Sequence, residues 1–518
     1  MADRVVDLDR LTTAAVREGA LRTTRVTVLG LARSGIALAR FFADAGALVT
    51  VYDGRPHEEL AAAIESLGGR PVELRLGPEV EPSSTWVGAH LIATSPSINP
   101  DYPTAEPRLR AALAAVVEAH RADPAGAPAL VSETDLVLRL CPCPTIGVTG
   151  TKGKTTTSSL IAALLGGDPA HPVVLGGNIG IPLVERLTEL TEDHRVVIEL
   201  SELQMPTLSR GTTVAVYTNV TADHLDRHGS LEAYRKVKRR LADLVDPKGA
   251  LVLNCDDEVV SRYAASATAE VVTYRRDLPG PGGLGIDDGW IVADGVRRLG
   301  AAGGGVAETG PRGRVLPISE LRIPGDHNVS NALAAAAAAL LFGVAPGAIR
   351  SAAAGFTGVE HRLEQVAVVD GVRFVNDSQG TQPDAVIAAL RAFPRPLVLI
   401  AGGRDKGVDL SGLGPVAAER ADAAVLIGES GPTLAAMFRA SGLARVESAG
   451  SLEAAVDRAD QIARELRGPD GDGPQATVVL SPAAASFDMF VDYAARGRAF
   501  KAAVAALAER RRTAEPGR

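Results

Sequence analysis

One stretch of the sequence decides the fold class: Thr145-Ile146-Gly147-Val148-Thr149-Gly150-Thr151-Lys152-Gly153-Lys154-Thr155-Thr156. An apolar run typical of a buried strand leads into a glycine-rich loop, and an apolar helix is predicted from 156 to 165. In this context backbone N–H groups cradle phosphates, a lysine reaches the β- and γ-phosphates, and a hydroxyl ligates Mg²⁺. The loop is shorter than the common pattern, because Val148 stands where the first glycine belongs. The stretch therefore predicts a phosphate-binding loop in an α/β fold.

Strands and helices alternate on both sides of this stretch. Upstream, the pattern predicts strands at 25–29, 48–52 and 91–94, with a helix at 36–45. Downstream of residue 357 it predicts strands at 373–376, 397–400, 424–427 and 476–480. We expect three α/β domains at 1–130, 131–356 and 357–518, the first and third Rossmann-like and the central one similar to P-loop ATPases. Gly, Pro and Asp crowd the stretch 278–314, which favours exposed hairpins or a mobile excursion.

Composition excludes several classes of protein. The 518 residues include 62 acidic and 54 basic side chains, which gives a net charge of −8. This composition has no excess of basic residues that would indicate binding to nucleic acid or to an anionic membrane. The uncharged run 332–349 is mostly alanine and contains Gly343 and Pro346, so it predicts a buried helix and not a membrane span. The N-terminus lacks an apolar signal core. We expect a soluble, cytoplasmic protein.

The three cysteines form no recognisable site. Cys141 and Cys143 flank Pro142, and Cys255 is far away in the sequence, so neither a zinc-ligand spacing nor a CxxC motif exists. Cys141-Pro142-Cys143 is interpreted as a hinge between the first two predicted domains.

A second glycine-rich loop, Gly30-Leu31-Ala32-Arg33-Ser34-Gly35, lies between the strand at 25–29 and the helix that follows. Backbone N–H groups at such a helix start can hold a phosphate, and Asp53 ends the next strand, where a ribose-binding acid would stand. Ala32 replaces the middle glycine of the dinucleotide pattern. The loop is compatible with NAD, with another nucleotide, or with a plain tight turn.

Polar residues follow two strands of the predicted central sheet. Glu199 follows the strand at 196–198, and Asp223, His224 and Asp226 follow the strand at 214–218. Carboxylate and imidazole groups at the carboxyl edge of a parallel sheet, beside a phosphate loop, suit Mg²⁺. Taken alone, His224 fits a hydrogen-bonded loop histidine. Lys238 taken alone fits a solvated basic helix face, and an ammonium cannot ligate a metal.

Ordered motifs over nearly the whole chain then become recognisable. They comprise 30–35, 52–55, 149–155, 178–180, 199–201 with Gln204, 219–227, 325–328 with Asn331, 361–364, 376–378, 402–407 and 480–500. On these motifs the chain resembles the Mur ligases, and within that family it is most similar to the branch that adds glutamate to UDP-N-acetylmuramoyl-L-alanine.

The resemblance implies roles for individual residues. The N-terminal domain would bind the UDP-substrate, through Gly30, Ser34, Asp53, Arg55, Asn178, Ser201 and Gln204. ATP would be bound by Gly150, Thr151, Lys152, Gly153, Lys154, Thr155, Thr156, Asn328, Asn331, Arg362 and Asp377. Glutamate would be held by Thr381, Lys406, Ser486, Phe487 and Tyr493. Metal ligands would be Thr155, Glu199, His224 and Lys238, and the catalytic residues Lys154, His224 and Lys238.

The activity implied is ATP-dependent amide formation in peptidoglycan precursor synthesis, through an acyl phosphate of the alanine carboxylate. The cofactors would be ATP, two Mg²⁺ ions and a carbamate formed from CO₂ on Lys238, in a monomer. D-Glutamate is the expected amino acid; alternatives are L-glutamate on the same acceptor, or a folylpolyglutamate-type ligase.

Glu202 and Gln379 depart from the family pattern, and Gln379 stands where a lysine is usual beside the glutamate pocket. A dehydrogenase or a non-catalytic scaffold is disfavoured by Ala32 and by the set Lys154, Glu199, His224 and Lys238.

Overall fold

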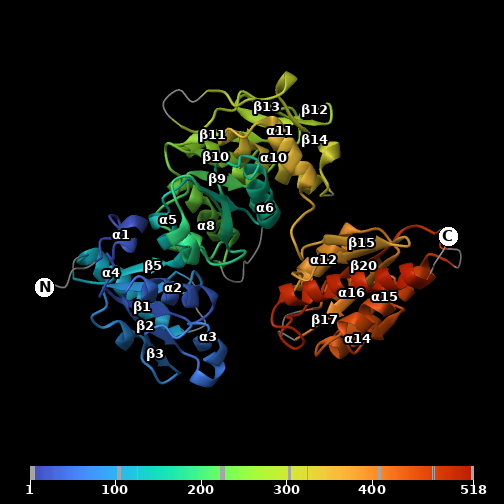
Figure 1. Cartoon of the computed structure of the whole chain (residues 1–518), viewed down its shortest axis with the longest axis horizontal. Coiled ribbons are helices and arrows are strands. Elements are labelled where there is room, and N and C mark those ends of the chain that lie inside the picture. Colours follow the sequence, from blue (N-terminus) through green and yellow to red (C-terminus); the bar gives the residue numbers. More distant parts are fainter. Residues whose placement is uncertain are drawn as a thin grey trace. The chain divides into compact units, whose positions relative to one another are not determined.

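The structure is a computed structural model that describes residues 6–101, 107–124, 126–221, 228–300, 305–323, 325–404, 410–468, 471 and 473–514. The chain divides into two compact units, Met1–Phe356 and Thr357–Arg518. The first unit holds two sheets and the second holds one, each with helices on its faces (Figure 1). The predicted α/β class is confirmed by these predominantly parallel sheets.

The first sheet is parallel throughout, in the order β3-β2-β1-β4-β5. Its strands are β1 (Arg25–Leu29), β2 (Leu48–Asp53), β3 (Val72–Leu76), β4 (Leu91–Thr94) and β5 (Ala129–Ser132). The helices that accompany it are α1 (Thr13–Arg17), α2 (Arg33–Asp44), α3 (Ala61–Glu65), α4 (Pro107–Ala122) and α5 (Glu133–Leu140). The sheet extends to Ser132, two residues past the predicted boundary at 130.

The second sheet has the order β14-β13-β12-β11-β10-β9-β6-β8-β7. Its strands are β6 (Thr145–Thr149), β7 (Val173–Gly177), β8 (Arg195–Glu199), β9 (Val214–Tyr217), β10 (Ala250–Asn254), β11 (Glu270–Tyr274), β12 (Gly283–Asp287), β13 (Trp290–Asp294) and β14 (Arg314–Pro317). Its helices include α6 (Lys154–Leu165), α8 (Leu231–Leu244), α9 (Glu258–Ser261), α10 (Asp326–Leu341) and α11 (Pro346–Gly355). The strands that carry the predicted site, β6, β8 and β9, lie side by side in parallel, so their carboxyl ends share one edge.

The stretch 278–314 was expected to form exposed hairpins or a mobile excursion. Among the described residues it does form a hairpin, β12–β13, but this hairpin belongs to the second sheet and is largely buried. β12, β13 and β14 pair antiparallel and extend the second sheet, and Leu284 and Ile291 are fully buried. Pro281 and Gly282 lie in the turn before β12 and Gly289 in the turn after it, whereas each of the three strands contains three consecutive buried residues. The turn-forming residues around them hid these short buried strands.

Helix α10 confirms the expectation of a buried alanine-rich helix. Every residue from Asn331 to Leu341 is buried, and the helix packs closely on α6. Alanine allows two helix backbones to approach closely, since its side chain adds little bulk. Across the described ranges, every helix falls short of the length and apolarity that a membrane crossing requires.

One hydrophobic core joins the first two sheets, which explains why they form a single unit. The cluster contains Phe42 and Val51 beside the first sheet and Leu187 and Ile198 beside the second. Burial of apolar surface shared between two sheets holds them as one body. The predicted separation at residues 130 and 131 stays a prediction.

The third sheet, in the second unit, has the order β15-β16-β20-β17-β18-β19. Its strands are β15 (Glu364–Val369), β16 (Val372–Asn376), β17 (Leu397–Gly402), β18 (Ala423–Ile427), β19 (Val446–Ser448) and β20 (Ala476–Leu480). Its helices are α12 (Pro383–Ala392), α13 (Leu413–Arg420), α14 (Gly431–Ala440), α15 (Leu452–Leu466) and α16 (Tyr493–Ala514). Only β15 is antiparallel to its neighbour.

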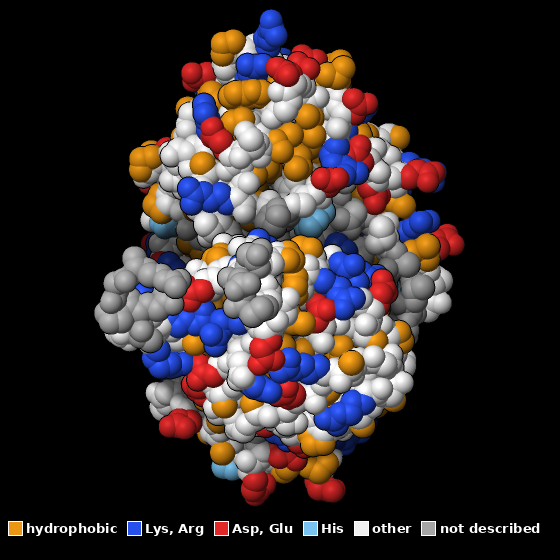
Figure 2. All heavy atoms as spheres, turned by 90° about the vertical axis from the view of Figure 1, so that its right-hand side faces the viewer, with side chains coloured by type: hydrophobic (Ala, Val, Ile, Leu, Met, Phe, Trp, Pro, Cys, Tyr) orange, Lys and Arg blue, Asp and Glu red, His pale blue; other side chains and the backbone are white. Residues whose placement is uncertain are grey.

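Charged side chains of both signs are interspersed on the face shown in Figure 2.

Candidate active site

The loop between β6 and α6 has a backbone that only glycine can supply at two positions. Gly150 has φ +150°, and a Cβ there would lie 1.9 Å from Thr218 Oγ1. Gly153 has φ +84° and caps the start of α6, and a Cβ there would lie 2.6 Å from Asn331 Oδ1. Both the conformation and the close approach exclude larger residues.

The segment after β9 holds the loop in place. Asn219 accepts hydrogen bonds from two loop amides: its backbone oxygen from Thr151 N at 2.8 Å, and Oδ1 from Lys152 N at 2.8 Å. Thr218 Oγ1 donates to the Lys152 carbonyl at 2.6 Å. These bonds order the loop before any ligand arrives, so less entropy is lost when phosphates bind.

Lys154 lies folded over the loop in this structure. Its Nζ donates to the carbonyl oxygens of Gly150 and Thr151, both at 3.0 Å. Thr155, in the first turn of α6, is buried. The predicted phosphate-binding residues thus lie together at the N-terminus of α6, where backbone N–H groups favour anions.

Two asparagines from α10 complete this edge of the loop. Asn331 Oδ1 accepts a hydrogen bond from Thr157 Oγ1 at 3.1 Å, and Asn331 Nδ2 donates to Asn328 Oδ1 at 3.0 Å. The structure therefore brings Asn331 beside Gly153, and Asn328 beside Asn331, although more than 170 residues separate these asparagines from the loop in the sequence.

Replacing Gly153 with alanine is expected to weaken ATP binding at least about tenfold and to lower the melting temperature. A left-handed non-glycine residue costs about 1–2 kcal/mol, and the new Cβ would also displace Asn331. Calorimetric titration with ATP and thermal unfolding measure both effects. Gly347→Ala is the matched control, because that glycine on α11 has no atom within 4 Å of an added Cβ. Equal nucleotide affinity in Gly153→Ala and Gly347→Ala would refute the requirement for glycine.

Lys238 lies under the same loop. It is fully buried, and its Nζ donates to the Gly150 carbonyl at 3.1 Å and to Thr149 Oγ1 at 3.4 Å. The Tyr234 ring, one helical turn earlier on α8, lies with its centroid 5.6 Å from Nζ. The interpretation as a solvated basic face therefore fails for Lys238, whereas the neighbouring Lys236 is exposed.

Glu199, at the end of β8, is a buried carboxylate with one free oxygen. Oε1 accepts a hydrogen bond from Asn178 Nδ2 at 2.8 Å, and among the described residues Oε2 has no hydrogen-bond partner. An unpartnered buried carboxylate oxygen fits a cation, because it would otherwise be left unsatisfied. The part of the chain that the structure describes contains no group of three or more His, Cys, Asp or Glu side chains able to hold a metal. Mg²⁺ at phosphate loops needs few protein ligands, so this set is compatible with it.

The loop at Gly30 is organised by a salt bridge. Asp53 Oδ2 accepts from Leu31 N at 2.8 Å, and the Arg55 guanidinium contacts both carboxylate oxygens, at 2.8 and 3.0 Å. Burial by itself raises the pKa of Asp53, but the hydrogen bonds from Arg55 and Leu31 outweigh it, and the net pKa is lowered. Asp53 is thus engaged in holding the loop, while the half-exposed Arg55 faces solvent on one side.

The loop at Gly30 and the segment 178–180 are neighbours within the first unit. Arg33, the first residue of α2, donates from Nη1 to the Gly180 carbonyl at 3.1 Å. Ser34 is half-buried in the first turn of α2, and Asn178 is exposed. The hydrogen bond therefore joins the start of α2, which carries Ser34, to the segment after β7, which carries Asn178.

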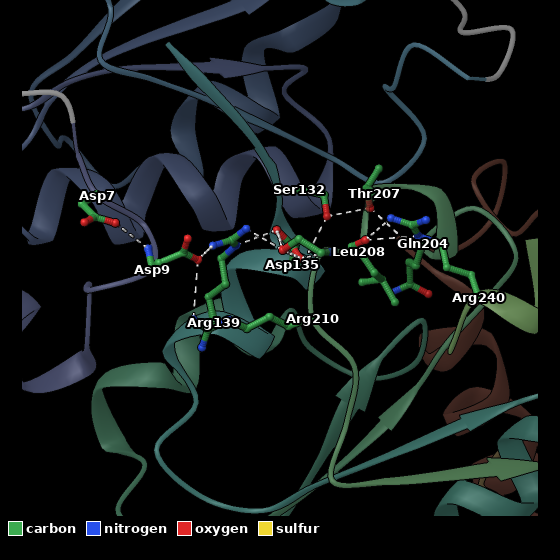
Figure 3. A network of polar contacts seen from close by, with 11 residues as sticks. Asp7, Asp9, Ser132, Asp135, Arg139, Gln204, Thr207, Leu208, Arg210 and Arg240 are labelled. Atoms are coloured by element: carbon green, nitrogen blue, oxygen red, sulfur yellow. Dashed lines mark hydrogen bonds and ion pairs between the residues drawn. The ribbon is translucent and has the colours of Figure 1, made fainter. Parts of the chain in front are cut away.

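Gln204 lies in a polar network that links α5 to the segment after β8 (Figure 3). Gln204 Oε1 accepts from Ser201 N and Oγ, at 2.8 and 3.1 Å, and Nε2 donates to Thr134 Oγ1 at 2.9 Å. Thr207 Oγ1 donates to Ser132 Oγ at 2.8 Å. The side chain of Gln204 is fully engaged, so it fixes the position of Ser201. Glu202, the departure from the family pattern, is also buried.

In the second unit, Asp377 follows β16 and is buried. Its Oδ2 accepts from Ser481 Oγ at 2.7 Å and its Oδ1 from Leu363 N at 3.1 Å. Burial raises the pKa of Asp377 to about 6, although these hydrogen bonds oppose the rise. Arg362 is exposed one residue before Leu363.

The raised pKa of Asp377 predicts that the free energy of unfolding of this protein depends on pH. Because the native carboxyl binds its proton more tightly than the unfolded one, its contribution to stability is present below about pH 4 and is lost as pH rises through 6. Relative to Asp377→Asn, wild-type protein should lose about 1.4 kcal/mol of unfolding free energy between pH 5 and pH 7.5. Urea unfolding of both proteins at the two pH values measures this difference. A difference that is independent of pH would contradict the assignment.

A buried arginine, Arg496, holds together the segments next to the predicted glutamate-binding residues Thr381 and Ser486. Arg496 donates to Ser378 Oγ and Ser378 O, both at 3.0 Å, and to the carbonyls of Ala484 and Ala485 at 3.2 to 3.3 Å. Burial lowers the pKa of Arg496 to about 10. Ser378 Oγ donates to the Tyr493 carbonyl at 2.8 Å, which ties the start of α16 to the segment after β16. Ser486 is buried and Thr381 half-buried, whereas Phe487 and Tyr493 are 65% and 39% exposed.

Four residues that the sequence marked as candidates, Asp223, His224, Asp226 and Lys406, lie outside the described residues. Sequence reasoning assigned no role to three residues that build the site, namely Asn219, Tyr234 and Arg496. Tyr234 could have been found from its i, i+4 spacing to Lys238 on one predicted helix, because side chains at that spacing lie on the same helix face. The side chains of Asn219 and Arg496 contact mainly backbone groups of segments that are distant in the sequence, and such contacts leave no mark in sequence spacing.

A loop whose two glycines cannot be replaced, at the N-terminus of a helix and beside a carboxylate with a free oxygen, is suited to bind phosphate with a cation. The first unit thus has the features of the α/β phosphate-binding class.

The chain belongs to the Mur ligase family. Residues 148–339 match the Mur ligase middle domain, and residues 361–484 match the glutamate ligase domain of Mur ligases. The UDP-N-acetylmuramoylalanine–D-glutamate ligase of Symbiobacterium thermophilum is 38% identical over 93% of this chain and 98% of its own. Proteins of the same name from Pelotomaculum thermopropionicum and Acidobacterium capsulatum are each 37% identical over 93% of this chain, and 98% and 96% of their own.

A solved structure supports the fold. The crystal structure of MurF from Acinetobacter baumannii aligns with a TM-score of 0.52, over 96% of this chain and 98% of its own, at 16% identity.

Proposed function

We propose that this protein is an ATP-dependent ligase that joins D-glutamate to UDP-N-acetylmuramoyl-L-alanine, in the synthesis of peptidoglycan precursors. The observation that carries the proposal is full-length similarity, at 37–38% identity, to relatives that bear this activity in their names. The geometry of the Gly150–Gly153 loop and of Glu199 supports it. ATP and Mg²⁺ use follows from membership of the Mur ligase family.

The reaction proposed transfers the γ-phosphoryl group of ATP to the alanine carboxylate. The glutamate amine then attacks the acyl phosphate, and phosphate leaves as the amide forms. Lys154 neutralises charge on the transferred group, which requires its Nζ to exchange the carbonyls of Gly150 and Thr151 for phosphate oxygens. The backbone amides at the start of α6 hold the remaining phosphate oxygens.

Mg²⁺, when bound, would neutralise the phosphate charge that develops during transfer. We propose that Thr155, Glu199, His224 and modified Lys238 hold it, with two ions in the complete site. The free Oε2 of Glu199 supports this set. Asn178, which donates to the other oxygen of Glu199, orients that carboxylate.

We propose that Lys238 reacts with CO₂ to form a carbamate. The neutral amine attacks the carbon of CO₂, and a proton is released. The product is an anionic carbamate group, whose two oxygens can coordinate a cation. Complete burial of Lys238 supports the proposal, because burial penalises the ammonium form relative to the neutral amine. The carbamate nitrogen keeps one N–H for the Gly150 carbonyl, which accepts from Nζ at 3.1 Å in the unmodified chain.

For the other substrates, we propose the following binding residues. Gly30, Ser34, Asp53, Arg55, Asn178, Ser201 and Gln204 would serve the UDP-substrate; Arg362 and Asp377 the adenosine; and Thr381, Lys406, Ser486, Phe487 and Tyr493 the glutamate. We further propose three substrate-binding domains in a cytoplasmic monomer.

An amino-acid screen tests the proposal. Phosphate release is followed with ATP, Mg²⁺ and UDP-N-acetylmuramoyl-L-alanine, in the presence of D- or L-glutamate. We expect turnover with D-glutamate at least about a hundredfold above L-glutamate, because a site built for one arrangement of carboxylates leaves polar groups unpaired with the other. Turnover with L-glutamate alone would show that the protein adds L-glutamate instead. The observation that favours this alternative is Gln379, which stands where the family usually has a lysine. Turnover only on a folate acceptor would overturn the proposal.

A further inference from the structure

The Cys141-Pro142-Cys143 segment contains a thiol pair that the ligase chemistry does not use. The two sulfur atoms lie 3.4 Å apart, and Cys141 Sγ also lies 3.5 Å from the Cys143 carbonyl oxygen. Cys141 is partly exposed and Cys143 is buried. The pair therefore has one sulfur within reach of a solvent reagent and a second sulfur directly beside the first.

The position of the pair separates it from the nucleotide loop. The segment connects the end of α5, at Leu140, with the start of β6, at Thr145, and thus joins the first sheet to the second. The glycine-rich loop follows the opposite end of β6. A chemical change at Cys141 acts on the connection between the sheets, and not directly on the phosphate-binding residues.

A cavity gives access to the thiols. It has a volume of about 380 Å³ and is lined by both cysteines together with Leu138, Arg210, Thr212 and Asp246, among others. Arg210 is half-exposed and lies 3.6 Å from Asp9, in the network of Figure 3. The cavity is thus a route by which a small reagent can reach Cys141, the more exposed of the two thiols.

The two thiols are not equivalent. The hydrogen bond with Cys143 lowers the pKa of the Cys141 thiol, although burial opposes this. Both the pairing with Cys141 and burial raise the pKa of Cys143. The more exposed sulfur is thus also the better thiolate, whereas the buried one is suited to act second.

We propose that Cys141 and Cys143 are a reversible dithiol–disulfide site, oxidised by low-molecular-weight disulfides. The Cys141 thiolate attacks one sulfur of the reagent, a mixed disulfide forms, and the first thiolate leaves. Cys143 then loses its proton, attacks the Cys141 sulfur and releases the second thiolate. Two protein thiols are oxidised, one external disulfide is reduced to two thiols, and the protons pass to the released thiolates.

The short distance between the two sulfurs favours the attack of Cys143 on the mixed disulfide, and the small ring makes the resulting disulfide easy to reduce. The sulfurs need to approach by about 1.4 Å to reach the disulfide bond length. The ring closed across Pro142 is small, and small strained disulfides are readily reduced. The bond would restrict the backbone of the connection between the two sheets in oxidising conditions and release it in reducing ones.

Redox equilibration of the full-length protein tests the site. The protein is equilibrated with mixtures of reduced and oxidised glutathione, quenched with acid, and analysed by thiol counting and by mass spectrometry of the peptide that carries both cysteines. Wild-type protein should lose two thiols and two hydrogens without retaining glutathione, and dithiothreitol should reverse the change.

Serine variants assign the roles, and serine is close enough in size to keep the fold, which circular dichroism checks. Cys143→Ser should accumulate one glutathione on Cys141, and Cys141→Ser should react at Cys143 at least about tenfold more slowly. Cys255→Ser is the matched control, since Cys255 is also partly exposed, and it should behave as wild type. Separate glutathione adducts on both cysteines of wild-type protein, a bond to Cys255, or faster reaction of Cys143 than of Cys141 would each overturn the proposal.

Discussion

Substitution of Lys238 by alanine is expected to lower ligase turnover by about 10³-fold or more, which is the scale of losing one charge-stabilising group in phosphoryl transfer. The side chain is fully buried, and its Nζ donates to the Gly150 carbonyl of the phosphate loop. If the functional form is a carbamate, a small carboxylate such as formate or acetate should enter the vacated space and restore part of the activity. Phosphate release under saturating substrates, with and without added carboxylate, measures both effects.

Two controls make this result specific. Lys236→Ala removes an exposed lysine from the same helix and should retain activity within about twofold, as surface changes generally do. Lys238→Arg keeps a positive charge but cannot readily form the carbamate, so it should be as inactive as Lys238→Ala. Full activity of Lys238→Arg, or no rescue of Lys238→Ala by any short carboxylate, would count against the carbamate.

Lys154→Met is expected to reduce turnover by about 10³-fold or more while leaving the fold intact. Methionine keeps much of the length of the side chain but removes the ammonium that contacts Gly150 O and Thr151 O in the nucleotide-free loop. Because the charge is needed most as the phosphoryl group transfers, the loss should appear mainly in kcat and less in the KM for ATP. Steady-state kinetics with varied ATP separates the two parameters.

Lys248→Met is the control for this experiment, because Lys248 is an exposed loop residue of the same unit. Its kinetics should match those of wild-type protein. A Lys154→Met enzyme whose KM rises while kcat is unchanged would show that the lysine contributes only to binding, and the role in transfer would then be wrong.

Strand and loop patterns predicted much of the architecture. The strands at 25–29, 145–149 and 476–480 form as expected, because β-branched runs of that length bury completely in parallel sheets. The phosphate loop was recognisable because two glycines and a lysine lie between such a strand and a helix. The strands at 283–287 and 290–294 were not recognisable, since each has only three consecutive buried residues and lies among glycine and proline.

The candidate site could be predicted only in part. Gly150, Lys154 and Glu199 follow strands whose parallel order places them at one edge, so their proximity follows from topology. The contact between Asn331 and Thr157 depends on how α10 packs on α6, and no local pattern encodes it. The pairing of Asp53 with Arg55, which occupies the carboxylate expected to bind ribose, likewise appears only when the loop at Gly30 has folded.

Amino-acid order alone was sufficient to establish the α/β class, the family and the identity of the phosphate-binding loop, because these depend on short-range periodicity and on residue types that few other chemistries require. Folding in three dimensions was needed to establish that Lys238 is buried and not solvated, that Glu199 keeps one oxygen free, and that Cys141 and Cys143 lie in contact at a cavity. Each of these properties depends on burial and on which atoms approach from distant parts of the chain, and packing, not sequence spacing, sets both.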